Sequence, residues 1–369
     1  MRSSRGRTVD VASLAELERR LAAGARSLSG WRVRSLDLTG HGDALRRCRL
    51  AGATFLGCTF APGDAVAAEE AGALVLPHLP DTPLDVYRAD LYSPAELYDT
   101  LHWPDSLDGR AYAWVQDGGE GDGAHALAET LHDHAVDEAL ARWREGRRLV
   151  GVMGGHRAAR GEATYRDAAR LGRLLADPDG AALTVATGGG PGAMEAANLG
   201  ARLASYDDAV LDVALEQLAA VPTYRPSIDA WVLLAFDVVA RWPDATPSLG
   251  IPTWHYGHEP PGAFATAVAK YVRNATREAI LLEVCDAGIV FLPGAAGTVQ
   301  EVFQDACENY YADEASVAPM VLVGERYWTE ELPVWPLLRA LARGRVMERH
   351  VHLVDTVEEA ADVVTRPPR

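Results

Sequence analysis

The hydrophobic pattern of the second half of the chain predicts alternating strands and helices. Short apolar runs, each long enough for one buried strand, recur between stretches whose apolar residues have helical spacing. The expected strands are 149–153, 183–186, 288–292, 319–324 and 351–354, and the expected helices include 165–175 and 264–285. This alternation favours an α/β fold, a doubly wound parallel sheet of Rossmann-like type with helices on both faces.

The first 145 residues have a different pattern and are expected to form an N-terminal extension. Residues 9–28 have the apolar spacing of an amphipathic helix. Residues 36–62 place small and large side chains at intervals of five, which resembles a short pentapeptide-repeat coil, although a plain meander of short strands fits equally well. A Gly-rich linker is expected at 116–123. The second domain is then 146–369, with a helical insertion at 203–253.

Composition narrows the possible partners and location. The formal net charge is −17, from 35 basic and 52 acidic residues, which argues against nucleic acid and anionic membranes as partners. No apolar run reaches the length of a membrane span, and the Arg-rich N-terminus is not followed by an apolar signal region, so we expect a soluble cytoplasmic protein. The four cysteines are far apart and are expected to be small buried hydrophobic residues of a reducing compartment.

The loop that follows the expected strand 288–292 has the features of an anion site. The strand ends in Pro-Gly, and a helix is predicted directly after the loop, so free backbone N–H groups and the positive end of a helix dipole meet there. The candidate ligands of a phosphate are Gly294, Ala295, Ala296, Gly297 and Thr298. Glu301 lies one turn into the helix. It is either a carboxylate beside the anion or part of a capping box with Thr298, and the spacing alone leaves both open.

A second glycine-rich loop follows the expected strand 183–186. Its sequence is not G-x-G-x-x-G, so a dinucleotide site is not indicated. Three adjacent glycines allow a ligand to approach the backbone closely. Glu195 either pairs with the dipole of the next helix or accepts hydrogen bonds from ribose hydroxyls. The candidate substrate-binding residues here are Gly188, Gly189, Gly190, Gly192, Met194 and Glu195.

Three basic residues are spaced three and four apart in the expected helix 264–285. They are Lys270, Arg273 and Arg277, and Lys270 is the only lysine of the chain. This spacing predicts one basic helix face, which either binds a phosphate or an active-site carboxylate, or is solvated and paired with neighbouring glutamates. A functional role is favoured for Arg277, because a guanidinium fork suits either anion.

Histidine side chains elsewhere in the chain could line a pocket for a base or bind a metal. Tyr256 and His258 are candidates for the wall of a pocket for a planar base. His255-x-x-His258 with Glu259 is only superficially similar to a zinc site, because no helix carries it and no further ligands are evident. His132 and His134 would point in different directions on a helix. No metal site is therefore predicted.

Taken together, the two loops and Arg277 resemble the LOG ("lonely guy") family. The matching segments are TGGGPGAMEA at 187–196, Arg277 and PGAAGTVQE at 293–301. These enzymes are cytokinin riboside 5′-monophosphate phosphoribohydrolases that were long labelled lysine decarboxylases. The resemblance covers about 147–364 and is closer to the longer bacterial nucleotide 5′-monophosphate nucleosidases. The family pattern is PGGxGTxxE, and Ala295 stands where its second glycine is expected.

The resemblance implies hydrolysis of the N-glycosidic bond of a nucleoside 5′-monophosphate to free base and ribose 5-phosphate. By position, Gly294, Gly297 and Thr298 would hold the phosphate, and Glu195 would bind ribose. Glu301 and Arg277 would be the catalytic pair. The resemblance also implies a homodimer with the site close to the dimer interface, and neither a metal nor an organic cofactor. Tyr256 and His258 are candidates for the acid that protonates the leaving base.

Two other functions use the same residues. A non-hydrolytic carrier or sensor of a phosphorylated nucleotide or pterin-type ligand would need the same two loops. A pyridoxal-phosphate lysine decarboxylase would need a Schiff-base lysine. Lys270 is the only residue that could serve, and it stands outside any recognisable cofactor motif, so this function is disfavoured.

Overall fold

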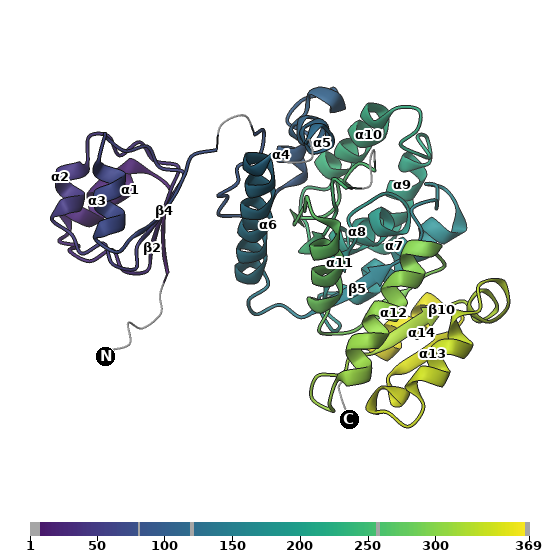
Figure 1. Cartoon of the computed structure of the whole chain (residues 1–369). Coiled ribbons are helices and arrows are strands. Elements are labelled where there is room, and N and C mark those ends of the chain that lie inside the picture. Colours follow the sequence, from purple (N-terminus) through teal and green to yellow (C-terminus); the bar gives the residue numbers. More distant parts are fainter. Residues whose placement is uncertain (1–7, 80–81, 119–121, 256–258, 366–369) are drawn as a thin grey trace. The chain divides into compact units, whose positions relative to one another are not determined.

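The computed structural model of the chain describes residues 8–79, 82–118, 122–255 and 259–365. The chain separates into two compact units, each of which is described by itself. The first consists of Met1–Ala89 with Gly119–Ala135, and the second consists of Asp90–Gly118 with Val136–Arg369. Figure 1 shows the elements of both units coloured along the chain. Residues 90–118, which the sequence pattern placed in the N-terminal extension, thus pack within the second unit.

The second unit contains a seven-stranded parallel sheet with the order β11-β10-β9-β5-β6-β7-β8. Its strands are β5 (Leu149–Met153), β6 (Thr184–Thr187), β7 (Ser248–Gly250), β8 (Ala267–Val268), β9 (Ile289–Phe291), β10 (Met320–Val323) and β11 (Val351–Val354). The predicted Rossmann-like α/β fold is confirmed. The strand order reverses where β5 pairs with both β6 and β9. Ligands of doubly wound sheets bind at such a switch point, beyond the carboxyl ends of the strands.

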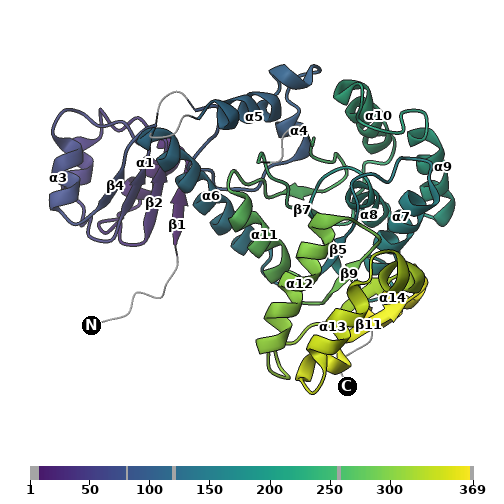
Figure 2. The same cartoon turned by 45° about the vertical axis from the view of Figure 1, so that its right-hand side comes forward.

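Helices cover this sheet. Those that contact the sheet and one another are α7 (Ala163–Leu175), α8 (Ala193–Arg202), α11 (Asn274–Glu283), α12 (Ala296–Tyr311), α13 (Val334–Ala342) and α14 (Val357–Thr365). Helices α7 and α8 lie side by side (Figures 1 and 2). Their backbones approach closely because Gly172 and Gly200 have no side chains, and a Cβ on Gly200 would overlap the carbonyl of Ala169. Small residues at 193–201 therefore position the loop that precedes α8.

The second unit contains further helices, and α6 (Gly123–Trp143) begins in the first unit and ends in the second. The others are α4 (Pro94–Leu97), η1 (Trp103–Asp105), α5 (Leu107–Asp117), α9 (Asp208–Leu218), α10 (Ile228–Arg241), η2 (Tyr327–Glu331) and η3 (Val346–Arg349). The insertion 203–253 is helical over α9 and α10, as predicted, but it ends in strand β7, which the sequence pattern did not indicate.

The predicted long helix 264–285 is wrong. Helix α11 begins only at Asn274, and the residues before it form β8 and a parallel bridge between Thr253 and Tyr271. Ala269 N–H donates to the Gly250 carbonyl at 2.9 Å, so this segment continues the pairing along the sheet edge. Pairing with a distant strand has overridden the local helical spacing. Lys270 and Arg273 precede α11 and do not share a helix face with Arg277.

Lys270 instead forms a buried ion pair with Asp108 of α5. Its Nζ lies 2.6 Å from Asp108 Oδ1, and only 1% of the Lys270 side chain is exposed. The same oxygen accepts from the Trp254 indole N–H at 2.9 Å, and Oδ2 accepts from that of Trp103 at 2.8 Å. Burial lowers the pKa of Lys270, while Asp108 opposes that change. The only lysine therefore fastens residues 90–118 to the edge of the sheet.

The first unit is a parallel sheet of four strands in the order β1-β2-β3-β4. Strands and helices alternate as β1 (Val9–Val11), α1 (Leu14–Ala22), β2 (Trp31–Arg34), α2 (Gly42–Arg46), β3 (Thr54–Leu56), α3 (Asp64–Glu70) and β4 (Leu74–Leu76). Val9 lies opposite Trp31 and Arg32 opposite Thr54, a spacing of 22 residues in both cases. Each coil is thus one strand followed by one helix, as in a solenoid.

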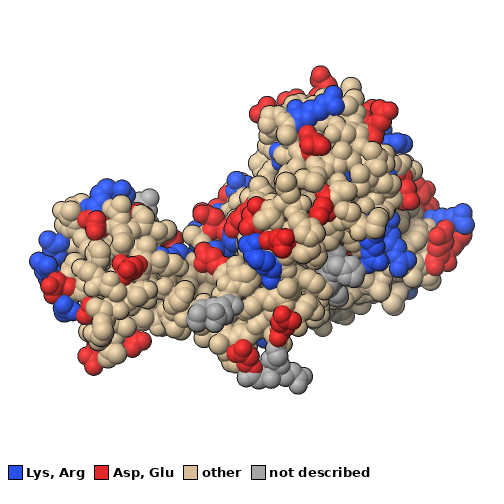
Figure 3. Space-filling view, turned by 90° about the horizontal axis from the view of Figure 1, so that it is seen from above, with Lys and Arg blue, Asp and Glu red and all other residues tan. Residues whose placement is uncertain are grey.

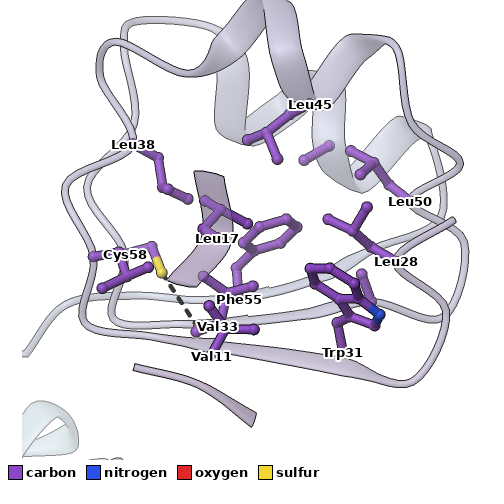
Figure 4. Close-up of a cluster of buried hydrophobic side chains, with 13 residues drawn as sticks. Val11, Leu17, Leu28, Trp31, Val33, Leu38, Leu45, Leu50, Phe55 and Cys58 are labelled. Carbon is purple, nitrogen blue, oxygen red and sulfur yellow. Dashed lines mark hydrogen bonds between the residues drawn. The ribbon is translucent and has the colours of Figure 1, made fainter. Parts of the chain in front are cut away.

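This repeat corrects three expectations for the N-terminal residues. Neither the pentapeptide-repeat coil nor the meander at 36–62 is present, and the expected helix at 9–28 begins instead as strand β1. The repeat is set by Gly30, Gly52 and Gly72, whose φ angles of 79°, 81° and 87° form the turn before each following strand. Figure 4 shows the core of the unit, in which the helices cover the inner face of the strands.

The surface shows no large separation of charge on the face drawn in Figure 3, where acidic and basic side chains are interspersed. Among the described residues, no helix has both the length and the apolar character needed to cross a membrane. Cys58 and Cys285 are buried as predicted, but Cys48 is half-buried and Cys307 is exposed.

Candidate functional site

Three loops meet at the switch point of the seven-stranded sheet. They follow β5, β6 and β9, and they comprise residues 154–157, 187–192 and 293–298. Gly155 N–H donates to the Pro293 carbonyl at 3.2 Å, and the Gly155 carbonyl accepts from Ala193 N–H at 3.2 Å. The loop after β5 therefore joins the two glycine-rich loops that the sequence singled out.

The loop after β9 leads into the exposed N-terminus of α12. The helix begins at Ala296, and the residue at its N-cap, Ala295, provides no side-chain cap. The first backbone N–H groups of a helix have no acceptor within the helix. Ala295, Ala296 and Gly297 are exposed, so these donors and the positive end of the helix dipole are accessible to an anion.

Thr298 and Ala295 settle two questions about this loop. Thr298 is the third residue of α12 and not its N-cap, so the capping-box explanation of Glu301 is wrong. Thr298 is buried, and a Cβ on Gly294 would overlap its hydroxyl, so the hydroxyl lies against the glycine backbone. Ala295 has φ −102°, which any residue adopts. The backbone therefore does not require a glycine at the position where the family pattern has one.

The triple-glycine loop after β6 is held by Thr187. Its hydroxyl accepts from Gly189 N–H at 3.0 Å and from the Asn198 side chain at 2.8 Å. Gly189 and Gly192 have φ angles of 70° and 74°, which favour glycine. The loop therefore has one fixed conformation, and side chains of the site pack directly against it.

Each end of this loop contacts a different group. A Cβ on Gly188 would overlap the Arg277 guanidinium. A Cβ on Gly190 would lie 3.0 Å from Met194 Cε and 3.7 Å from Glu259 Oε2. Further along, a Cβ on Gly192 would lie 2.8 Å from His156 Cα. Arg277 thus lies at one end of the loop, and His156 and Glu259 lie at the other.

Arg277 is fixed by backbone groups at the ends of two strands. Its Nε donates to the Ile251 carbonyl at 2.7 Å, and its Nη2 donates to the Gly188 carbonyl at 3.1 Å. Its Nη1 lies 2.9 Å from Glu278 Oε1, and the side chain is buried. A guanidinium held in this way keeps its charge and its orientation when a ligand binds.

Glu301 carries a carboxyl group suited to proton transfer at neutral pH. Burial raises its pKa from 4.5 to about 7, Arg277 acts to lower it, and Glu278 acts to raise it. Arg277 is thus close enough to act on Glu301 electrostatically. A carboxyl group with a pKa near the operating pH can both accept and return a proton.

A second buried carboxyl group lies one turn further along α12. Asp305 is 6% exposed, and burial together with Glu308 raises its pKa from 3.8 to about 8. Its Oδ1 accepts from the Asn309 side chain at 3.2 Å, and its Oδ2 has no hydrogen-bond partner within the described part of the chain. Asp305 is therefore mainly protonated at neutral pH.

Replacing Asp305 with Asn is expected to change how stability depends on pH. Since the pKa of Asp305 is raised on folding, its contribution to stability is complete below about pH 4 and is lost as the pH rises towards 8. Asn cannot ionise, so the free energy of unfolding of Asp305→Asn should rise relative to wild type between pH 5 and pH 8. Urea titrations at several pH values measure the difference. A difference that is constant with pH would show that Asp305 ionises normally.

Several other predicted residues have partners in the fold. Glu195 is 1% exposed; Arg160 Nε donates to its Oε2 at 3.1 Å, and the Tyr165 hydroxyl donates to the same oxygen at 2.9 Å. Its other oxygen pairs with Arg160 Nη2. Arg273 is the exposed N-cap residue of α11. Lys270 pairs with Asp108 and does not join the loops.

The remaining predicted residues divide into two groups. Tyr256 and His258 lie outside the described residues. The structure brings together Gly188, Gly189, Gly190, Gly192, Met194, Arg277, Gly294, Ala295, Ala296, Gly297, Thr298 and Glu301 through the contacts given above.

His156 and Glu259 were not among the residues predicted from the sequence. His156 Nδ1 lies 3.5 Å from Glu259 Oε1, and the two side chains are 45% and 34% exposed. The signal was available, because Gly154-Gly155-His156 directly follows a predicted buried strand, as the other two glycine loops do. Within the described residues, no group of three or more His, Cys, Asp or Glu side chains could hold a metal ion.

Comparison with known families connects part of this site to a family. Residues 240–366 match the family model described as "Possible lysine decarboxylase", which covers about a third of the chain. The match includes Arg277 and the loop 293–301, but it does not include the triple-glycine loop. No curated protein is significantly similar to the chain. Residues 240–366 are thus similar to the family that carries the lysine decarboxylase label, and this match, together with the α/β fold, supports the resemblance to LOG proteins.

Proposed function

We propose that this protein hydrolyses the N-glycosidic bond of a nucleoside 5′-monophosphate, releasing the free base and ribose 5-phosphate. The observation that carries the proposal is the position of Glu301. Its carboxyl group, with a pKa of about 7, lies one turn behind the exposed N-terminus of α12 and within the electrostatic range of the Arg277 guanidinium. This arrangement suits a substrate with a phosphate at one end and a reacting carbon nearby.

Each part of the site has a separate task in this reaction. The N-terminus of α12 binds the 5′-phosphate, and this binding energy positions the ribose although it acts away from the reacting carbon. Thr298 and Glu301 are three residues apart, about 4.5 Å along the helix axis, so the carboxylate lies within reach of the ribose. Breaking the bond develops positive charge on the sugar, which the Glu301 carboxylate stabilises while it accepts a proton from the attacking water.

Arg277 complements Glu301 in this scheme. Its charge favours the ionised form of Glu301, which burial disfavours. Because backbone carbonyls at the ends of β6 and β7 hold the guanidinium, it needs no rearrangement when the substrate binds. With Arg277 nearby, a substantial fraction of Glu301 is ionised at neutral pH and can accept a proton.

Lysine decarboxylation is disfavoured by the state of Lys270. Its ammonium group is buried and lies 2.6 Å from Asp108 Oδ1, so forming a Schiff base would leave Asp108 unpaired inside the protein. A carrier function is disfavoured by Glu301, because binding a phosphate requires no carboxyl group with a raised pKa beside it.

The test compares nucleoside 5′-monophosphates with the matching nucleosides and triphosphates. We expect release of free base from the monophosphates only. Nucleosides lack the phosphate that the anion site binds, and triphosphates carry two additional phosphates that the site must accommodate. Tight binding of a monophosphate without release of base would favour the carrier. Equal rates with nucleosides would contradict the role of the α12 N-terminus.

The rate of hydrolysis is expected to rise with pH through about 7. Below the pKa of Glu301 the carboxyl group is protonated and cannot accept a proton from water. The measurement is kcat/KM from pH 5 to 9, because kcat/KM reports ionisation in the free enzyme, the state to which this pKa refers. A profile that is flat between pH 6 and 8 would show that Glu301 is not the base.

Replacing Gly297 with Ala is expected to impair substrate binding without harming the fold. A Cβ on Gly297 would meet no protein atom within 4 Å, and Ala in a helix is favoured over Gly by about 0.5–1 kcal/mol. The methyl group would occupy the space where the phosphate approaches, so we expect KM to rise by about tenfold, the equivalent of 1.4 kcal/mol.

Gly123→Ala is the matched control for this variant. Gly123 is the first residue of α6, just as Gly297 is the second residue of α12, and a Cβ on Gly123 would also meet open space. Gly123 belongs to the first unit. It should leave both KM and stability near their wild-type values. A Gly297→Ala variant with an unchanged KM would place the phosphate elsewhere.

The LOG resemblance further implies a homodimer, and the sequence pattern predicts a cytoplasmic protein; we propose both. The acidic net charge supports a small-molecule substrate and not a nucleic acid as the partner.

A further inference from the structure

The proposed hydrolysis needs an acid, because the base leaves as a poor anion unless it gains a proton. Glu301 serves the water on the sugar side, so the acid must lie on the base side of the ribose. Resting on the proposed function, we propose that His156, oriented by Glu259, is the residue that protonates the leaving base.

The backbone places His156 at the junction of both ligand-binding loops. A Cβ on Gly192 would lie 2.7 Å from the His156 carbonyl carbon, so the triple-glycine loop packs directly on this residue. The preceding residue, Gly155, donates its N–H to the Pro293 carbonyl at the start of the anion loop. His156 is thus fixed at the carboxyl end of β5, the central strand of the switch point.

The side chain of His156 has one nitrogen oriented by a carboxylate. Nδ1 lies 3.5 Å from Glu259 Oε1, so Nδ1 faces Glu259 and Nε2 lies on the opposite side of the ring. The ring is 45% exposed, so a ligand can reach it. A carboxylate behind one ring nitrogen is the usual way to orient a histidine that transfers a proton through the other.

Arg277 and His156 contact opposite ends of the triple-glycine loop. Arg277, the partner of Glu301, packs against Gly188 at the start of the loop. Glu259 packs against Gly190, and His156 packs against Gly192. A ribose held by Glu301 would therefore direct its base past this buried loop towards His156.

The proton balance of the step is complete without a co-reactant. The C1′–N bond breaks, and its electron pair goes to the base, which takes the proton from His156 Nε2. Water forms the new C1′–O bond and gives a proton to Glu301. Glu301 then releases that proton to solvent and His156 regains one, so the net reaction consumes only water.

The test compares two leaving groups in wild type and His156→Gln. One substrate is the nucleoside monophosphate that wild type hydrolyses fastest, and the other is 4-nitrophenyl riboside 5-phosphate, whose leaving group needs no proton. We expect His156→Gln to lose roughly 10²–10⁴-fold in kcat on the nucleotide, as is typical when a general acid is removed, and less than about tenfold on the nitrophenyl substrate. Glu259→Gln should show the same selectivity with a smaller loss.

His78→Gln is the control, because it makes the same substitution at an exposed histidine of the first unit, outside the three loops of the site. It should leave both rates within about twofold of wild type, the scatter usual for exposed substitutions. Equal losses of His156→Gln on both substrates, or no loss on the nucleotide, would overturn the role of His156 while leaving the proposed function intact. A wild-type protein that hydrolyses neither substrate would overturn the proposed function itself, and the role of His156 with it.

Discussion

Glu301→Gln is expected to abolish turnover of nucleoside 5′-monophosphates while the protein stays folded and still binds them. Gln keeps the size of the side chain but can neither accept a proton from water nor balance the charge that develops on the ribose. Together these effects should lower kcat by about 10³-fold or more. Binding should persist because the phosphate ligands in the loop 293–298 are unchanged. Base release followed by chromatography, together with calorimetric titration of the monophosphate, measures the two quantities separately.

Asp305→Asn is the matched control for that experiment. Asp305 lies one turn further along α12, is also buried and has a pKa of about 8, so Asn replaces a group that is already mainly uncharged at pH 7. We expect its activity to stay within about twofold of wild type at pH 7, as for substitutions outside the reacting groups. An active Glu301→Gln variant, or equal loss of activity in both variants, would show that the carboxyl groups of α12 serve the fold and not the reaction.

The largest expected effect on stability is that of Glu195→Ala. Its carboxylate accepts from Arg160 and from the Tyr165 hydroxyl, and all three groups are buried. Removing it leaves the Arg160 guanidinium charged and buried without its partner, which costs about 3–5 kcal/mol for a pair of this kind. The same guanidinium donates to the Trp231 carbonyl at 3.0 Å, so the loss should also loosen the contact with α10. The midpoint of urea unfolding, measured with its slope, gives the change.

The double variant Arg160→Met with Glu195→Leu separates a structural role of Glu195 from ribose binding. Removing both charges together leaves no unpaired charge, although the buried Tyr165 hydroxyl loses its acceptor, so part of the lost stability should return. If Glu195 served mainly to bind ribose, Glu195→Ala would instead unfold at the wild-type urea concentration and show only a raised KM.

The strands of the sheet were predictable where the information was local. β5, β6, β9, β10 and β11 lie in short, mainly apolar runs that end near glycine or polar residues, which indicate parallel strands. β7 and β8 have three residues and two, too few for a period to be visible. Residues 270, 273 and 277 have helical spacing by coincidence. The backbone at 267–271 pairs with β7 and Thr253, and helix α11 begins only at Asn274.

The repeat of the first unit was not predicted, because it too depends on pairing between residues distant in sequence. A five-residue alternation was visible at 36–62, but the structural repeat of 20–22 residues is marked mainly by Gly30, Gly52 and Gly72. Three glycines among 34 in the chain are a weak signal. Only the parallel register shows that each of them begins an equivalent coil.

Within the site, the glycine-rich loops were easier to predict than the ion-pair partners of the buried side chains. The loops at 187–192 and 293–298 follow from local chemistry, since strand, glycines and helix are adjacent in sequence. The partner of Glu195 is 35 residues away, and that of Lys270 is 162 residues away, so neither ion pair could be foreseen. Likewise, the pairing of His156 with Glu259 depends on how the loops after β5 and before β8 are brought together.

The most direct test of the account is the stoichiometry of products from one nucleoside 5′-monophosphate. Purified protein is incubated with the monophosphate, and free base and ribose 5-phosphate are both quantified over time, with Glu301→Gln in parallel. We predict that both products appear in equal amounts with wild type and that neither appears with the variant. Recovery of intact monophosphate from folded wild-type protein, or release of base at the same rate by the variant, would contradict it.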